Sequence, residues 1–332
     1  VYLIVCTSVV MYVVLDGFDL GVGALHLFAK KDEERRLFLN AIGPVWDGNE
    51  VWLVILFGAL FAGFPVAYAT ICSAFYTPIM MLIAGIIFRA VAIEFRSKLE
   101  SPRWRKMWDV TFCLASYAIL FFIALLLAGL VRGIPIDENR IYQGGLADFF
   151  TPYALVLGVT SILLFSMHGS LFLLMKTEGE LHARLKKWSL RAVALFIAAF
   201  LGLTLYTIFD IPHMIAPFQR YPALAIVPLA VVLMIGAMIT AIRTERSGRA
   251  FIFSCLMISL LFVLAGIGTF PTIVTSRLDP AYNVTMYNSG SDEKTMKIIL
   301  IAAAIGVPFV LAYGAWIYRI FRGKVHIGDA SY

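Results

Sequence analysis

The decapeptide GPVWDGNEVW, residues 43–52, decides how this sequence should be understood. It places Asp47, Asn49 and Glu50 at the start of a long apolar run. Ionisable side chains within a bilayer cost a few kcal/mol each on insertion scales, so those that occur there are treated as functional until shown otherwise. The decapeptide therefore combines a membrane-spanning pattern with polar side chains that are candidates for a functional site.

The composition predicts an integral membrane protein. The chain has 332 residues, of which 61% are hydrophobic and 14% are charged. Soluble domains are closer to half apolar and about a quarter charged. The net charge of +6 does not indicate a nucleic-acid partner, because the basic residues form short clusters between the apolar runs. The four cysteines lie inside apolar runs without a C-x-x-C motif and are interpreted as core residues.

The apolar runs predict an all-α bundle of nine transmembrane helices that forms a single domain over residues 1–332. A spanning helix needs about 20 apolar residues, and strand-type alternation, which a barrel would require, is absent. The turn at residues 63–65 predicts a tight hairpin between the second and third helices. The predicted spans are residues 1–28, 40–63, 66–92, 108–132, 151–175, 188–209, 222–243, 250–274 and 297–321.

The loop charges predict the orientation. Basic clusters follow the odd-numbered spans and the last span, whereas few basic residues follow the even-numbered ones. By the positive-inside rule, the N-terminus is expected outside and the C-terminus in the cytoplasm. The basic residues expected on the outer side are Arg132, Arg140, Arg220, Arg277, Lys294 and Lys297.

Two pairs of acids lie within the first two spans. Asp16 and Asp19 belong to the first span, and Asp47 and Glu50 belong to the second. The members of each pair are three residues apart, so they share one helix face. With 1.5 Å of rise per residue, Asp19 lies about 14 Å from the cytoplasmic end and Glu50 roughly 15 Å. The pairs are therefore expected at similar depths.

The third span adds Arg89, about 6 Å from its cytoplasmic end, and Glu94 near that end. One interpretation is a static ion pair, in which Arg89 neutralises a carboxylate such as Asp47. The alternative is a hydrated path for protons, or a cation site, formed by Asp16, Asp19, Asp47, Glu50, Arg89 and Glu94.

The histidines and tryptophans indicate a functional site less clearly than the acids do. His168 is the histidine that lies well inside a span, and haem sites between helices usually need paired ligands from facing helices. The chain is therefore not expected to hold a metal or haem alone. Trp46 and Trp52 are six residues apart and should face different sides of their helix. Gly17 and Gly21 form a small-residue pattern that predicts close helix contact.

Several motifs together resemble subunit II of cytochrome bd-type quinol oxidases. The likeness covers almost the whole chain, and the joint occurrence of the first two motifs is its most specific part. The motifs are LDGFDLGVGAL, KKDEERRLFLNAIGPVWDGNEVWLV, FRAVAIEFRSKLESPRWRKMWD, HGSLFLLMKTEGELHARLKKW and NVTMYN.

The resemblance implies a terminal respiratory oxidase of a bacterial or archaeal cell membrane that oxidises quinol and reduces dioxygen to water, generating a membrane potential. It implies that haem b and haem d are held by subunit I, while this subunit supports subunit I and contributes proton and oxygen access. It also implies a structural quinone, small accessory subunits and contact with membrane lipid.

The resemblance also implies roles for single residues. Asp19 matches a polar or cation-associated position, and Asp47 matches a carboxylate assigned to a proton path, with Arg89 close by. Trp52 matches a tryptophan that lines an oxygen tunnel. Glu50 stands where other members carry Gln.

Two further functions remain open from the residues themselves. One is a proton- or cation-coupled transporter in which Asp19, Asp47 and Glu50 bind the coupling ion. No convincing inverted repeat with paired broken helices supports it. The other is an inert scaffold that stabilises a partner subunit.

Overall fold

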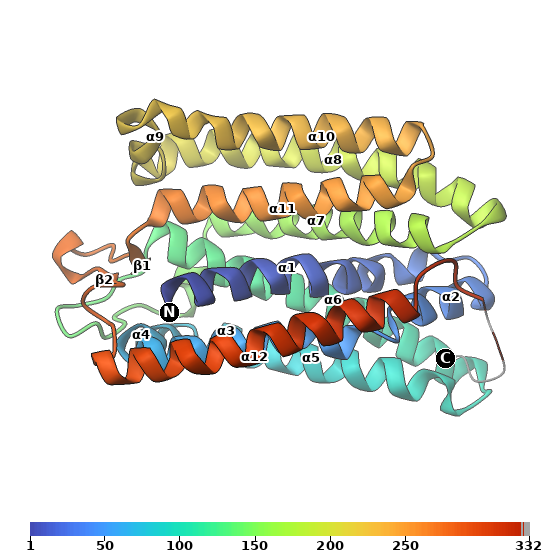
Figure 1. The fold of residues 1–332 in the computed structure, drawn as a ribbon, viewed down its shortest axis with the longest axis horizontal. Helices are drawn as coiled ribbons and strands as arrows, with labels where there is room; N and C mark the ends of the chain where they lie inside the picture. The colour runs from blue at the N-terminus through green and yellow to red at the C-terminus, as the bar shows by residue number, and fades with distance from the viewer. Residues whose placement is uncertain (327, 329–332) are drawn as a thin grey trace.

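The protein is a bundle of long helices, as Figure 1 shows for the computed structural model, which describes residues 1–326 and 328. The α-helices are α1 (Tyr2–Leu25), α2 (Asp32–Ile42), α3 (Trp46–Gly63), α4 (Pro65–Ala74), α5 (Tyr76–Phe95), α6 (Pro102–Arg132), α7 (Pro152–Lys176), α8 (Gly179–Asp210), α9 (Ala216–Arg220), α10 (Ile226–Arg243), α11 (Ser247–Thr269) and α12 (Glu293–Ile320).

Short elements complete the described chain. The strands β1 (Thr272–Val274) and β2 (Val284–Thr285) form a two-stranded antiparallel ribbon in an outer loop of the predicted topology. The 3₁₀ turns are η1 (His26–Phe28), η2 (Arg96–Lys98), η3 (Leu146–Phe149), η4 (Pro212–Met214), η5 (Pro222–Ala225) and η6 (Pro280–Tyr282). The ribbon is a small exception to the all-α architecture that the sequence predicts.

The number of spans agrees with the sequence prediction. Within the described residues, 8 helices are long and apolar enough to cross a membrane, or 9 if the bent pair α2 and α3 forms one span. The helices lie side by side, and the chain termini lie at opposite ends of the bundle (Figure 1). An odd number of crossings requires this arrangement. Several helices, such as α6 and α8, extend beyond the predicted ranges at the end of the bundle where the basic clusters lie.

The second predicted span, residues 40–63, is not one straight helix. α2 ends at Ile42 and α3 begins at Trp46, with a bend of 47° between their axes. Pro44 contributes to the break, because proline lacks the backbone N–H that would continue the helix, and the backbone leaves helical geometry at Val45, with φ of −125°. The decapeptide of residues 43–52 therefore contains the break and the first turns of α3.

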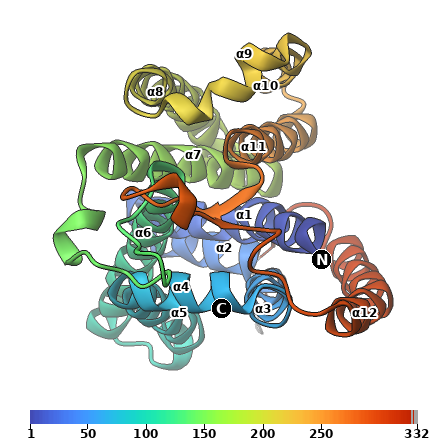
Figure 2. The same ribbon diagram turned by 90° about the vertical axis from the view of Figure 1, so that its left-hand side faces the viewer.

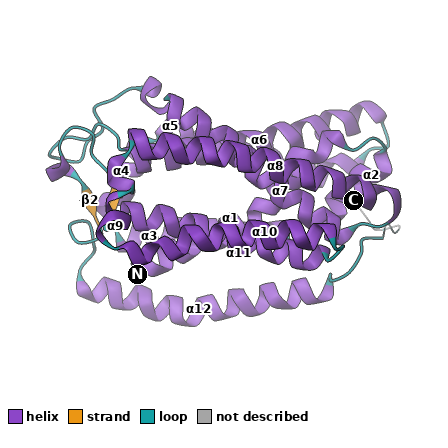
Figure 3. Cartoon of the chain, turned by 90° about the horizontal axis from the view of Figure 1, so that it is seen from above, coloured by secondary structure: helices purple, strands orange, loops and turns teal. Residues whose placement is uncertain are grey.

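The predicted tight hairpin between the second and third spans is wrong. The range 66–92 divides at Phe75 into the short helix α4 and the spanning helix α5. α4 runs across the end of the bundle, from α3 to α5 (Figures 2 and 3). Pro65 occupies the first turn of α4, where its missing N–H costs nothing, so it starts a new helix rather than a turn.

α1 is the central helix of the bundle. It packs against α3, α6, α7 and α11, and much of its C-terminal half is buried. Glycines permit its closest contact, which is with α7. A Cβ atom at Gly21 would overlap the Phe165 carbonyl oxygen and lie 2.9 Å from the backbone nitrogen of Gly169. This confirms the predicted small-residue contact on this helix.

α12 lies at the margin of the bundle, where it contacts α3 (Figure 2). None of its described residues is buried. The segment that follows it is tied to the end of α7: Lys176 Nζ donates to the Phe321 carbonyl at 2.5 Å, and Lys324 Nζ donates to the Thr177 carbonyl at 2.8 Å. α12 therefore presents most of its surface outward.

Replacing Gly21 by Ala should destabilise the bundle by about 1–3 kcal/mol, the usual cost of forcing extra atoms into a packed core. The measurement is the midpoint of thermal denaturation of the purified protein in detergent. Gly202→Ala on α8 is the matched control, because a Cβ atom there meets nothing within 4 Å. Equal midpoints for both variants would contradict the close packing of α1 on α7.

Candidate functional site

The centre of the candidate site is the guanidinium of Arg89 on α5, whose side chain is 1% exposed. Its Nη1 donates to Asp16 Oδ1 on α1 at 2.7 Å. Its Nη2 donates to Glu50 Oε1 on α3 in a second, very close ion pair. One cation thus joins three helices by pairing with two carboxylates.

A chain of hydrogen bonds extends from the same region to α12. Asn49 Nδ2 donates to Asp19 Oδ2 at 2.7 Å and lies 3.3 Å from the Leu15 carbonyl oxygen. The Tyr318 hydroxyl donates to Asn49 Oδ1 at 2.9 Å. Asn49 therefore connects a fully buried carboxylate on α1 to a tyrosine on the outermost helix, α12.

The buried carboxylates have spare hydrogen-bonding capacity. Asp16 Oδ2 and Asp19 Oδ1 are buried and have no hydrogen-bond partner among the described residues. Buried polar atoms are nearly always satisfied. These two oxygens are therefore suitable places for a proton, an ordered water molecule or a small cation.

The other predicted site residues lie at the edges of this cluster. Asp47 is exposed in the first turn of α3, on the side that also exposes Val51 and Val54. The Arg89–Asp47 ion pair, one of the two interpretations of the sequence, is not formed: the structure pairs Arg89 with Asp16 and Glu50. Glu94 is partly buried near the end of α5, five residues beyond Arg89.

The two tryptophans of the decapeptide are both in the core. Trp52 is 3% exposed and Trp46 is 9% exposed, and both belong to the main hydrophobic cluster. Although their spacing predicts different helix faces, both tryptophan side chains are therefore buried. A role of Trp52 in oxygen access remains a prediction.

A second polar cluster, which sequence reasoning missed, lies at the basic end of the bundle. Asp109 on α6 accepts from Arg96 Nε at 2.5 Å and from Arg35 Nη1 at 3.0 Å, and its Oδ1 lies 2.6 Å from His26 Nε2. Asp109, Arg96 and His26 are at most 1% exposed. Arg96 belongs to a basic cluster after the third predicted span, and Asp109 stands at the start of the fourth, so neither the sequence position nor the spacing indicated that the two side chains meet.

The two histidines buried among the helices make hydrogen bonds to neighbouring groups. His168 Nε2 donates to the Val14 carbonyl at 2.9 Å, and its Nδ1 lies 2.8 Å from Ser254 Oγ, so both of its ring nitrogens are engaged. His26 lies against Asp109 through Nε2, whereas its Nδ1 has no hydrogen-bond partner among the described residues. No group of three or more potential metal-ligating side chains occurs among the described residues.

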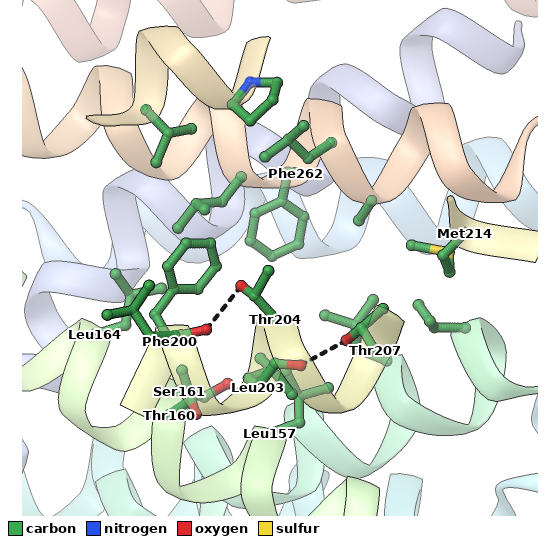
Figure 4. A pocket seen from close by; sticks show the side chains of 18 of the residues that line it. Leu157, Thr160, Ser161, Leu164, Phe200, Leu203, Thr204, Thr207, Met214 and Phe262 are labelled. Carbon is green, nitrogen blue, oxygen red and sulfur yellow. Dashed lines mark hydrogen bonds between the residues drawn. The ribbon is translucent and has the colours of Figure 1, made fainter. Parts of the chain in front are cut away.

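A large apolar cavity, also missed from the sequence, lies between α6, α7, α8, α10 and α11. Its volume is about 710 Å³, and aliphatic and aromatic side chains form most of its wall (Figure 4). The hydroxyl groups of Thr204 and Thr207 donate to the Phe200 and Leu203 carbonyls of their own helix. These threonines therefore present little polarity to the cavity, which suits an apolar ligand.

Comparison with known proteins identifies relatives over almost the whole chain. Residues 1–321 match the family described as cytochrome bd terminal oxidase subunit II. The chain is 34% identical to the cytochrome bd ubiquinol oxidase subunit 2 of Bacillus subtilis (strain 168), over 98% of this chain and 95% of that protein. It is 32% identical to the cytochrome bd-I ubiquinol oxidase subunit 2 of Escherichia coli (strain K12), over 98% and 94% respectively.

A solved structure shares the fold. A chain in the structure of the bd oxidase from Geobacillus thermodenitrificans superposes with a TM-score of 0.80, covering 96% of each chain. The sequence identity of that pair is 17%, so this likeness concerns the fold. It supports the overall helix arrangement described above.

Replacing Arg89 by Gln should destabilise the protein by about 3–5 kcal/mol, because it leaves buried carboxylates without their cation. The measurement is the denaturation midpoint of the purified protein in detergent. Asp47→Asn on α3 is the control, since this acid is exposed and has no ion pair among the described residues. A loss no larger for Arg89→Gln than for Asp47→Asn would show that the ion pairs do not stabilise the fold.

Proposed function

The chain belongs to the cytochrome bd terminal oxidase subunit II family, and from this premise we propose how it serves the quinol oxidase of which it is a part. It is a multi-pass protein of the bacterial membrane and a subunit of an enzyme that oxidises quinol and reduces dioxygen. The comparisons support this function and not the alternative of an ion-coupled transporter.

We propose that the basic end of the bundle is cytoplasmic and that the N-terminus lies outside. The loops after α1, α5, α7 and α10 carry the basic clusters, and all of these follow helices that end on the same side as the C-terminus. The positive-inside rule assigns that side to the cytoplasm. The site around Arg89 then lies in the cytoplasmic half of the membrane.

We further propose that the polar cluster carries protons toward the haem-bearing subunit. The supporting observation is that buried acids on α1 connect, through Arg89 and Asn49, to groups at the surface of α3 and α12. Glu50 is 19% exposed and Asp47 is exposed, so these carboxylates lie where the cluster reaches the surface of α3. Protons consumed in making water would reach subunit I across this surface.

The exposed apolar faces of α3 and α12 support a place for subunit I. Val54 is 72% exposed and Phe61 61% exposed on α3, and Phe309 is 72% exposed on α12. Faces of this kind lie against lipid or against another membrane subunit. We propose that subunit I covers α3 beside Asp47, while small accessory subunits and lipid cover the remaining faces.

We propose that haem b and haem d are held by subunit I. The hydrogen bonds of His168 support this assignment, because both of its ring nitrogens are engaged, one at the Val14 carbonyl and the other at Ser254 Oγ. When bound, the haems supply electron transfer and oxygen reduction. This chain would then supply packing, a proton route and, beside the buried Trp52, access for dioxygen.

The apolar cavity is our proposed site for the structural quinone. Its volume of about 710 Å³ and its aliphatic and aromatic wall suit an isoprenoid chain. Met214 on η4 lies at one end of it (Figure 4). The quinone would stabilise the packing of α6, α7, α8, α10 and α11 rather than take part in turnover.

Replacing Asp47 by Asn should lower quinol oxidase turnover by roughly tenfold or more, because positioned proton-transfer groups contribute factors of that size or larger. The measurements are oxygen consumption with quinol and the visible haem spectrum of the purified oxidase. The haem content should stay normal. Glu138→Gln, in the loop after α6, is the control for loss of an acid at the opposite end of the chain's membrane-crossing bundle.

Full activity of the Asp47→Asn oxidase would remove this residue from the proton route. Loss of haem together with activity would instead assign Asp47 to assembly of the two subunits.

Replacing Ala265 by Trp should reduce the quinone that copurifies with the oxidase, because the indole would fill part of the cavity that Ala265 lines. The measurement is extracted quinone per haem, with oxygen consumption recorded in parallel. Ala198→Trp is the matched control, since Ala198 is exposed on α8 outside the cavity wall. An unchanged quinone content in Ala265→Trp would place the quinone elsewhere.

A further inference from the structure

A second cavity, of about 810 Å³, lies at the other side of the η4 turn from the apolar cavity. The segment of η4 and α9 separates the two cavities. Its residues Met214 and Phe218 line the apolar cavity, whereas His213 and Pro217 line the second one. The remaining wall comes from the end of α6, the end of α11 and the loop that contains β1. We call this space the outer cavity.

The outer cavity carries positive charge. Arg132, at the end of α6, and Arg220, at the end of α9, both line it. Arg132 Nε donates to Asp210 Oδ2 at 3.0 Å, whereas Arg220 has no ion pair among the described residues and lies over the Tyr221 ring at 5.4 Å. No carboxylate is among the residues that line the cavity. Two guanidinium groups line the cavity and one of them is paired with an acid, so the lining carries excess positive charge.

Hydrogen-bond donors surround this charge. The hydroxyl-bearing residues Thr272 and Thr275 line the same cavity, whereas the hydroxyl of Thr269, which also lines it, donates to the Ala265 carbonyl at 3.0 Å. His213 Nε2 donates to the Val131 carbonyl at 2.9 Å, which fixes the imidazole at the wall. Arginine side chains bind phosphate groups in bidentate geometry, and neighbouring hydroxyl groups add further hydrogen bonds. The lining therefore suits an oxyanion better than a neutral polar group.

The position of the cavity indicates an amphiphilic ligand. It lies where α6, α9 and α11 end, which is the expected level of the membrane surface. Next to it, Phe270 is 53% exposed and, at the start of α10, Ile226 is 68% exposed. Basic residues are scarce at this end of the helix bundle, yet two of them, Arg132 and Arg220, line one cavity. A phosphate group with apolar chains would match both the basic lining and the apolar surface beside it.

We propose that the outer cavity binds the phosphate of an anionic phospholipid, with Arg132 and Arg220 as the recognising side chains. The acyl chains would lie on the exposed apolar surface of α10 and α11. The bound lipid would hold the η4 and α9 segment against the end of α11. A free phosphate ion offers the same oxyanion chemistry, so the experiment has to separate these two sources.

The experiment measures phospholipid binding to the purified and delipidated two-subunit oxidase, by titration with phosphatidylglycerol in detergent. Arg220→Gln and the double variant Arg132→Gln/Arg220→Gln should weaken binding by about fivefold for each arginine removed. Arg277→Gln is the matched control, since Arg277 belongs to the same end of the chain, pairs with Asp148 and does not line the cavity. A parallel titration uses inorganic phosphate as competitor.

Weaker binding in the two cavity variants, normal binding in Arg277→Gln and no competition by millimolar phosphate would support the lipid site. Competition by phosphate with equal loss in the same variants would overturn the lipid as the source and assign the cavity to a soluble anion. Equal binding by all four proteins would overturn the site itself. Haem content and quinol oxidase activity are recorded for each variant, because a misassembled oxidase would also bind lipid more weakly. If the double variant is misassembled, lipid binding by the Arg220→Gln variant alone decides.

Discussion

The buried guanidinium of Arg89 is the group on which the rest of this structure depends. It pairs with Asp16 on α1 and Glu50 on α3, so three helices must meet at one depth for the charges to be neutralised. Removing charges from water costs several kcal/mol per ion, and only close pairing offsets that cost. The break at Pro44 starts α3 at the level where Asn49 reaches Asp19 on α1 and Glu50 reaches Arg89 on α5. The glycine contact between α1 and α7 keeps the central helix in place behind them.

This arrangement separates the chemical tasks of the subunit in space. The acids and their single cation occupy the half of the bundle near its basic end, beside the exposed faces of α3 and α12. The apolar cavity lies on the other side of α1, among α6, α7, α8, α10 and α11. The buried histidines are used as hydrogen-bonding residues within the helix packing. In the function proposed above, the first region serves proton access and the second holds an apolar ligand.

The sequence predicted the membrane architecture well, because length and hydropathy act locally and need no knowledge of packing. It also predicted that Asp16, Glu50 and Arg89 would lie at similar depths, since helix rise converts position into depth. It could not choose among the carboxylates as partners of Arg89, because the face that Asp47 occupies depends on the bend at Pro44. Asn49 and Tyr318 were not recognised as connected, because they are 269 residues apart and meet only through the placement of α12. The cavities and the Asp109 network likewise arise from tertiary contacts that no local pattern encodes.

A double-mutant cycle on Arg89 and Asp16 tests the central claim most directly. The free energies of unfolding of the wild type, Arg89→Gln, Asp16→Asn and the double variant would be measured by denaturation of the purified oxidase in detergent. If Arg89 exists to neutralise this carboxylate, the double variant should recover stability relative to Arg89→Gln, with an interaction energy above about 1 kcal/mol. Losses that simply add would contradict the account, because they would mean that the two buried charges stabilise the bundle independently.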